Sequence, residues 1–262
     1  MRLLFFGDVV GRPGRRALAA LLPRLAAREE IDFVIANCEN ASAGKGIDPR
    51  SAEELHEAGV DVLTSGNHIW QNRDIIPYMR ERGQLLRPLN FPPGIPGIGW
   101  TVQKARHSDT RVAVLNLIGR VFMAPVDCPF RAAEQALAEI GREARVVLVD
   151  MHAEATSEKV AMGRFLDGKV SVVIGSHTHI QTADETVLPG GTAYLTDAGM
   201  CGPEDSVLGV RTDRVVERFL TQMPVRFEVA GGPVLVQGAV IEVDATSGRA
   251  LGVRRLRERV DV

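Results

Sequence analysis

The chain has few of the residues that mark several classes of protein. Its 262 residues include three cysteines, at positions 38, 128 and 201, with no Cys-x-x-Cys pair. Such sparse cysteines do not form a disulfide framework and give no sign of structural zinc. The first apolar run ends at Phe6 and is too short for a signal peptide or a membrane span. These absences favour a protein of the reducing cytoplasm, with no membrane partner.

Lysine and aromatic residues are also scarce. Lysine occurs only at positions 45, 104, 159 and 169, the arginines are spread along the chain, and the formal net charge is -2. This balance gives no general basic field for nucleic acid. Two Trp, two Tyr and nine Phe offer little aromatic surface on which bases could stack. We therefore expect no stable nucleic-acid partner and favour a small-molecule ligand.

The hydrophobic pattern predicts an α/β (α+β) fold in a single domain over residues 1–262. Helical periodicity fills most gaps between the early apolar runs, and Pro13 and Pro49 suit helix starts. The strands expected early are at about 2–6, 32–37, 60–65, 111–118, 145–150 and 170–175. Antiparallel strands are expected later, at 191–196, 225–229, 234–243 and 251–256. Such a change of rhythm predicts mixed sheets, packed together with helices outside.

Three segments are candidate walls of a substrate pocket. Residues 87–99 are rich in Pro and Gly, and residues 119–130 follow a predicted strand and expose Phe122 and Met123. Residues 197–210 form the third segment. Each of the first two segments could be a loop that covers the substrate or a loop that packs on the core.

Five apolar stretches end on residues that bind metals or phosphates. Open α/β sheets bind ligands beyond the carboxyl ends of their strands, so distant residues can converge there. The candidates are Asp8, Glu39, Asn40, Asn67, His68, His152, His177 and His179. Four of the six histidines fall at these ends, whereas His56 and His107 lie in polar surroundings. The clustering predicts a site for two metal ions.

Each motif alone has an ordinary structural alternative, such as a helix cap at Asp8 or a turn at Glu39. The glycines near Asp8 lack the dinucleotide-loop spacing, and the segment 39–46 fails the P-loop pattern. His177 and His179 are expected in an extended segment, with both rings on one side. Arg12 and Lys45 are the candidate phosphate-binding residues.

With these residues in view, the chain resembles the calcineurin-like metallophosphoesterase superfamily. The matches are Asp8, Glu39, Gly66-Asn67-His68, His152 and Gly175-Ser176-His177-Thr178-His179. Val10 stands where the superfamily has a histidine, and Glu39-Asn40 replaces a Gly-Asp pair. These departures are similar to the YmdB-like bacterial branch. So are the stretches 7–11, 39–41, 152–159 and 196–200.

The resemblance implies a four-layer fold of two mixed sheets flanked by helices, and a phosphodiesterase acting on cyclic nucleotides, with 2′,3′-cyclic monophosphates leading. It also implies two ligand sets: Asp8, Glu39, Asn40 and His179 for one metal, and Glu39, Asn67, His152 and His177 for the other. A hydroxide between the metals would attack phosphorus while His68 assists the leaving group. Mn²⁺ or iron suits this mixture of carboxylate, amide and imidazole ligands best, and Zn²⁺ is compatible.

Two other functions compete with the cyclic-nucleotide phosphodiesterase. The same metals could serve a phosphomonoesterase or protein phosphatase. A metal-stabilised regulatory or RNA-associated protein is the third alternative, and the presence of His68, which no metal needs, argues against it. A homo-oligomer is left open, because the late strands could pair across a dimer or form a second sheet.

Overall fold

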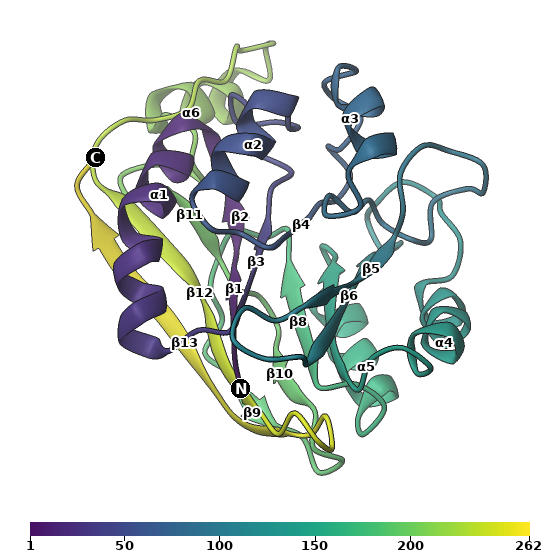
Figure 1. Ribbon diagram of the computed structural model, residues 1–262. Coiled ribbons are helices and arrows are strands. Elements are labelled where there is room, and N and C mark those ends of the chain that lie inside the picture. The colour runs from purple at the N-terminus through teal and green to yellow at the C-terminus, as the bar shows by residue number, and fades with distance from the viewer.

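The structure is a computed structural model that describes all 262 residues, in four layers with two facing β-sheets inside (Figure 1). The first sheet has the strand order β2-β11-β12-β1-β3-β4, with β13 paired to β12. Its strands are β1 (Arg2–Phe6), β2 (Asp8–Val9), β3 (Phe33–Asn37), β4 (Val62–Thr64), β11 (Met200–Pro203), β12 (Val234–Val243) and β13 (Ala250–Val260). β1 runs parallel to β3 and antiparallel to β12, so this sheet is mixed.

The second sheet has the order β5-β6-β7-β8-β10-β9 and is also mixed. β6, β7, β8 and β10 run parallel to their neighbours, whereas the edge strands β5 and β9 are antiparallel. The strands are β5 (Trp100–Lys104), β6 (Arg111–Ile118), β7 (Val146–His152), β8 (Val172–Ser176), β9 (Thr186–Val187) and β10 (Ala193–Leu195).

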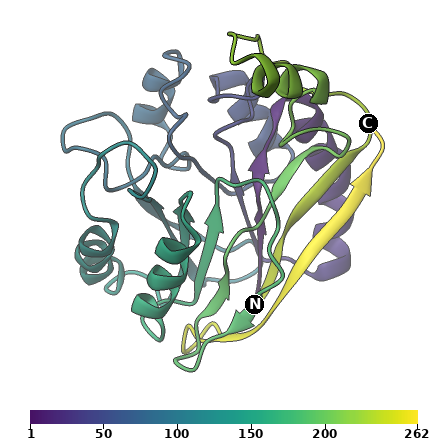
Figure 2. The ribbon, with the colours of Figure 1, turned by 180° about the vertical axis from the view of Figure 1, so that it is seen from behind.

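Helices cover the outer faces of the two sheets, as Figures 1 and 2 show from opposite sides. On the first sheet they are α1 (Gly11–Glu29), α2 (Pro49–Glu57) and α3 (Ile75–Glu81). On the second sheet they are α4 (Pro129–Ile140) and α5 (Thr156–Leu166). α6 (Thr212–Thr221) lies at the end of the molecule toward which β1 and β8 run. No helix is both long and apolar enough to cross a membrane.

The alternation of side chains along β1 explains why the sheets pack on both faces. Leu3 and Phe5 join the core between the two sheets, whereas Leu4 and Phe6 join the core under α1 and α2. Successive side chains of a strand point to opposite faces, so a strand buried on both faces needs an unbroken apolar run. The predicted two-sheet, four-layer class is thereby confirmed.

The C-terminal third departs from prediction in several places, among them β9 and β11, which were not predicted as strands. Residues 225–229 form no strand and only Val229 makes an isolated bridge, to Val210. The preceding segment is α6, a helix that buries only Val215 and was not predicted. The strand predicted at 225–229 is therefore wrong: Phe227 is exposed, and no sheet edge pairs with the segment. The strand predicted at 251–256 lies within β13, where Arg254, Arg255 and Arg257 are exposed.

Candidate metal centre

The predicted ligands meet where the carboxyl ends of the two sheets face each other. Glu39 and Asn40 follow β3, Asn67 follows β4, His152 ends β7, and His177 follows β8. Asp8 begins β2, which pairs with β11 rather than continuing β1. The fold therefore brings together residues from both sheets, such as Asp8 and His177, which are 169 positions apart along the chain.

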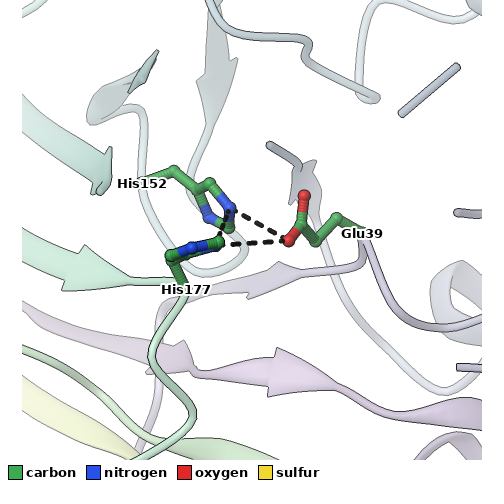
Figure 3. Close-up of side chains that lie close together, drawn as sticks. All are labelled: Glu39, His152 and His177. Carbon is green, nitrogen blue, oxygen red and sulfur yellow. Dashed lines mark hydrogen bonds and ion pairs between the residues drawn. The ribbon is translucent and has the colours of Figure 1, made fainter. Parts of the chain in front are cut away.

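One group of donor atoms surrounds Glu39 (Figure 3). The Nε2 atom of His152 lies 3.0 Å from Glu39 Oε1, 3.0 Å from His177 Nδ1 and 3.2 Å from Asn67 Oδ1. Glu39 and His152 are at most 1% exposed, and His177 Nδ1 is 3.8 Å from Glu39 Oε1. The donor atoms of Glu39, His152 and His177 are close enough to share one cation.

A second group surrounds Asp8. Its Oδ1 atom lies 3.9 Å from His179 Nε2, which is 3.3 Å from Asn40 Oδ1. The other oxygen of Asp8 accepts the backbone N–H of His177 at 3.0 Å, but Oδ1 is buried and has no hydrogen-bond partner. A buried carboxylate oxygen without a partner costs free energy, and a cation would supply the missing interaction. This unpaired atom fits a second metal position.

The hydrogen bonds behind His152 fix which ring nitrogen faces the cluster. Ser176 Oγ donates to Asp150 Oδ1 at 2.6 Å, so it accepts from His152 Nδ1 at 2.9 Å. Thr64 Oγ1 and Asn37 Nδ2 also donate to Asp150. With Nδ1 engaged in this way, Nε2 is the nitrogen of His152 that faces Glu39 and would bind a metal.

The other two imidazoles are oriented in the same way. His179 Nδ1 donates to the carbonyl of Leu208 at 3.1 Å, which leaves Nε2 unprotonated beside Asp8. His177 Nε2 donates to Glu154 Oε2 at 3.1 Å, so Nδ1 is the nitrogen that faces Glu39 and would bind a metal. Sequence reasoning assigned no role to Glu154, although the pattern His152-Ala-Glu154 was a usable signal. All three rings thus turn one nitrogen toward the same space.

The two buried carboxyl groups have opposite pKa shifts. Burial raises the pKa of Asp8 well above its usual value, and the charge of Glu39 adds to the rise. Burial also acts to raise the pKa of Glu39, but in the protein without metal the charge of His152 and the hydrogen bonds from His152 and His177 outweigh it and hold the pKa well below normal; bound cations would take the place of these protons. Two acids in one buried space need positive charge nearby, so this donor set fits two cations.

The turn that carries His177 and His179 differs from the prediction. β8 ends at Ser176, and the backbone φ angles are +97° at His177 and +66° at His179. The expectation of an extended segment with both rings on one side is therefore wrong. Both residues lie in the left-handed region, which costs a residue other than glycine about 1–3 kcal/mol. The turn lets His177 use Nδ1 and His179 use Nε2.

Gly66 has no room for a side chain. A Cβ atom there would lie 2.1 Å from His152 Nε2 and 2.4 Å from Glu39 Oε2. Any other residue would occupy the space between these two ligands. The glycine of the Gly66-Asn67-His68 motif is therefore explained by the close approach of the chain to the metal centre.

His68 lies beside the cluster without belonging to it. Its backbone N–H donates to Glu39 Oε2 at 3.0 Å, and its half-buried imidazole makes no hydrogen bond within the chain. Burial lowers the pKa of His68, and the charge of nearby Lys45 lowers it further. Lys45 and Arg12 are both exposed, Lys45 near His68 and Arg12 at the start of α1.

Known proteins resemble this chain over nearly its whole length. A protein named 2′,3′-cyclic-nucleotide 2′-phosphodiesterase, from Bacillus subtilis, is 44% identical over 256 residues, which cover 98% of this chain and 96% of that protein. A crystal structure of a hypothetical protein from Thermus thermophilus superposes with a TM-score of 0.92 at 42% identity and covers 99% of both chains. The predicted phosphodiesterase-type hydrolase agrees with the name of the Bacillus relative.

A crystal structure described as a novel phosphatase, from Mycoplasma pneumoniae, also superposes with a TM-score of 0.92. It is 32% identical and covers 100% of this chain and 94% of that one. The family model described as YmdB-like protein matches residues 4–256. This chain therefore belongs to the YmdB-like protein family, as its departures from the general metallophosphoesterase pattern predicted.

Proposed function

We propose that the protein is a dinuclear metal-dependent phosphodiesterase that hydrolyses cyclic nucleotides, with 2′,3′-cyclic nucleoside monophosphates as leading substrates. The observation that carries the proposal is the convergence of carboxylate, amide and imidazole donors around buried Glu39 and Asp8. The choice of substrate is supported by the name of the Bacillus subtilis relative, which is 44% identical to this chain.

Glu39 would be shared between two cations. Asp8, Asn40 and His179 would complete one ligand set, and Asn67, His152 and His177 the other. When bound, two such cations lower the pKa of water and neutralise charge that develops on a phosphoryl group. The absence of thiolate ligands favours Mn²⁺ or iron and is compatible with Zn²⁺.

The amide ligands keep the centre attractive to an anion. Asp8 and Glu39 are the only carboxylates in the two ligand sets, and Asn40 and Asn67 contribute neutral oxygens. Two divalent cations would therefore exceed the negative charge of their ligands. A phosphodiester, which is itself an anion, would meet a net positive site.

His68 would assist the leaving ribose oxygen. Its backbone is held by Glu39, but its imidazole is free of other bonds and only half-buried, so it can reach a bound substrate. Even as a neutral ring, which its lowered pKa favours, it carries one N–H that can donate to developing negative charge. Lys45 and Arg12 are proposed phosphate contacts, and the position of Lys45 near His68 supports the first of them.

The test is turnover of 2′,3′-cyclic AMP by protein reconstituted with Mn²⁺, with 2′-AMP and 3′-AMP separated by chromatography. Rapid formation of one isomer is expected. The monoester p-nitrophenyl phosphate serves as the comparison substrate. Faster turnover of the monoester would favour the phosphomonoesterase alternative, and no turnover of any cyclic nucleotide by protein that carries both metals would refute the proposed substrate.

A further inference from the structure

The strained turn between β8 and His179 is held by a buried carboxylate. Thr178 lies between the two histidines, and both its backbone N–H and its hydroxyl donate to Asp197 Oδ2, at 3.2 Å and 2.8 Å. The other oxygen of Asp197 accepts the backbone N–H of Gly199 at 2.8 Å. One carboxylate therefore fixes the turn through main chain and side chain together.

The carboxylate of Asp197 is itself fixed by a buried lysine. Lys159, on α5, donates from Nζ to Asp197 Oδ2 at 2.6 Å, and both side chains are 1% exposed. Desolvating two charges costs several kcal/mol per ion, so replacing such a pair by apolar residues is often neutral or stabilising. Stability alone is therefore a weak reason for this pair, whose carboxylate instead holds the turn between the two histidines.

Gly175 makes room for this arrangement. A Cβ atom at this position would lie 1.8 Å from the carbonyl oxygen of Thr196 and 2.8 Å from Cδ of Lys159. The first glycine of the Gly175-Ser-His-Thr-His motif therefore lets the lysine stem pass β8 to reach Asp197. The motif that carries two candidate ligands thus also accommodates the residues that hold them.

We propose that Lys159, Asp197 and Thr178 are positioning residues that keep the ligand turn in its left-handed conformation, an inference that rests on the proposed metal centre. The positive φ angles at His177 and His179 persist only where neighbouring contacts enforce them. Without the hydrogen bonds of Thr178 the turn relaxes, and one imidazole of each ligand set no longer points at its metal position. We call Lys159, Asp197 and Thr178 the clamp. Loss of the clamp is expected to weaken metal binding first and to lower turnover as a consequence.

The substitution Thr178→Val tests the clamp with the least disturbance. Valine has nearly the same shape but lacks the hydroxyl that donates to Asp197, while the backbone N–H bond and the buried ion pair are left intact. We expect about 10-fold weaker Mn²⁺ binding, measured by calorimetric titration, because losing a partner behind a ligand typically costs that much. The Tm of the metal-free protein should change little. Thr178→Ser keeps the hydroxyl and should restore wild-type affinity.

Thr182→Val is the matched control, because Thr182 Oγ1 accepts the backbone N–H of Asp197 without touching the ligand turn. We expect its Mn²⁺ affinity to equal that of the wild type. The double variant Lys159→Met with Asp197→Asn removes both charges and should weaken Mn²⁺ binding about 100-fold. Wild-type affinity in Thr178→Val, or equal losses in Thr178→Val and Thr182→Val, would overturn the positioning role.

Metal binding and turnover separate this inference from the proposed function. If the wild type binds Mn²⁺ but leaves every cyclic nucleotide intact, the proposed function fails, while the clamp is still judged by the Mn²⁺ affinities. If the wild type binds no Mn²⁺, the metal centre and the clamp fail together.

Discussion

The two sheets contribute chemically different halves of the metal centre. Segments of the first sheet supply only oxygen donors, and segments of the second supply only imidazoles. The oxygen half is Asp8, Glu39, Asn40 and Asn67, and the imidazole half is His152, His177 and His179. Both proposed ligand sets draw on each half. The difference teaches that neither sheet alone provides a complete set, so the docking of the sheets creates the site.

The halves also differ in how their ligands are held. In the imidazole half, parallel register places His152 opposite Ser176, and this pairing brings Ser176 Oγ to His152 Nδ1. In the oxygen half, Glu39 lies beyond the end of β3 and accepts the backbone N–H of His68. The imidazoles are therefore oriented by acceptors behind them, whereas Asp8 keeps an oxygen without a partner.

The largest effect is expected when the shared residue of the oxygen half is changed. Glu39→Gln keeps the shape but removes the charge that both cations would share, so we expect turnover to fall about 10⁴-fold or more. Elemental analysis should show loss of metal. Glu134→Gln, on the exposed face of α4, is the control and should behave as wild type. Full metal content in Glu39→Gln would contradict the shared role.

His68 separates catalysis from metal binding within the same half. We expect His68→Ala to keep both metals and to lose about 10³-fold in kcat, because a positioned proton donor is typically worth 10²- to 10⁴-fold. Rate assays with 2′,3′-cyclic AMP and elemental analysis check the two parts. His107→Ala removes an exposed histidine remote in sequence and should have no effect. An unchanged rate in His68→Ala would remove His68 from the mechanism.

Removing the metals should lower the stability of the folded protein, because the cations would bind ligands from both halves. A ligand present at about 100 times its Kd stabilises the folded state by about 2.7 kcal/mol. For a chain of this size that corresponds to a Tm higher by roughly 5–10 °C with metal than with chelator. Differential scanning calorimetry measures the difference, and Glu39→Gln should reduce it. Identical Tm values with and without metal would show that the halves are held without it.

The smallest effect is expected far from the centre, at an ion pair that also joins the two sheets. Arg255 on β13 lies 2.8 Å from Glu185, which precedes β9, and their side chains are 38% and 24% exposed. Exposed pairs contribute about 0–1 kcal/mol. Arg255→Ala should therefore leave turnover unchanged and shift the urea midpoint only slightly. A large loss of turnover would mean that the centre depends on contacts at the opposite edge.

Much of the fold could be predicted from the sequence because local patterns carry it. The run Leu3 to Phe6 is apolar at every position, as a strand buried on both faces requires. α6 was missed although its apolar residues Val215, Val216, Phe219 and Leu220 repeat at helical spacing, and of these only Val215 is buried. The positive φ angles of His177 and His179 were missed as well, because they depend on long-range hydrogen bonds that Thr178 donates to Asp197.

By itself, the sequence determined the strand ends and the residue types placed there, including Glu39-Asn40 and the His-x-His pair. These are local properties of a chain whose apolar runs stop at polar residues. Only the tertiary structure decided which nitrogen of each histidine faces inward, which oxygen of Asp8 stays unpaired, and why Lys159 is buried. Each of these depends on atoms from both sheets or from α5, which come together only when the layers pack.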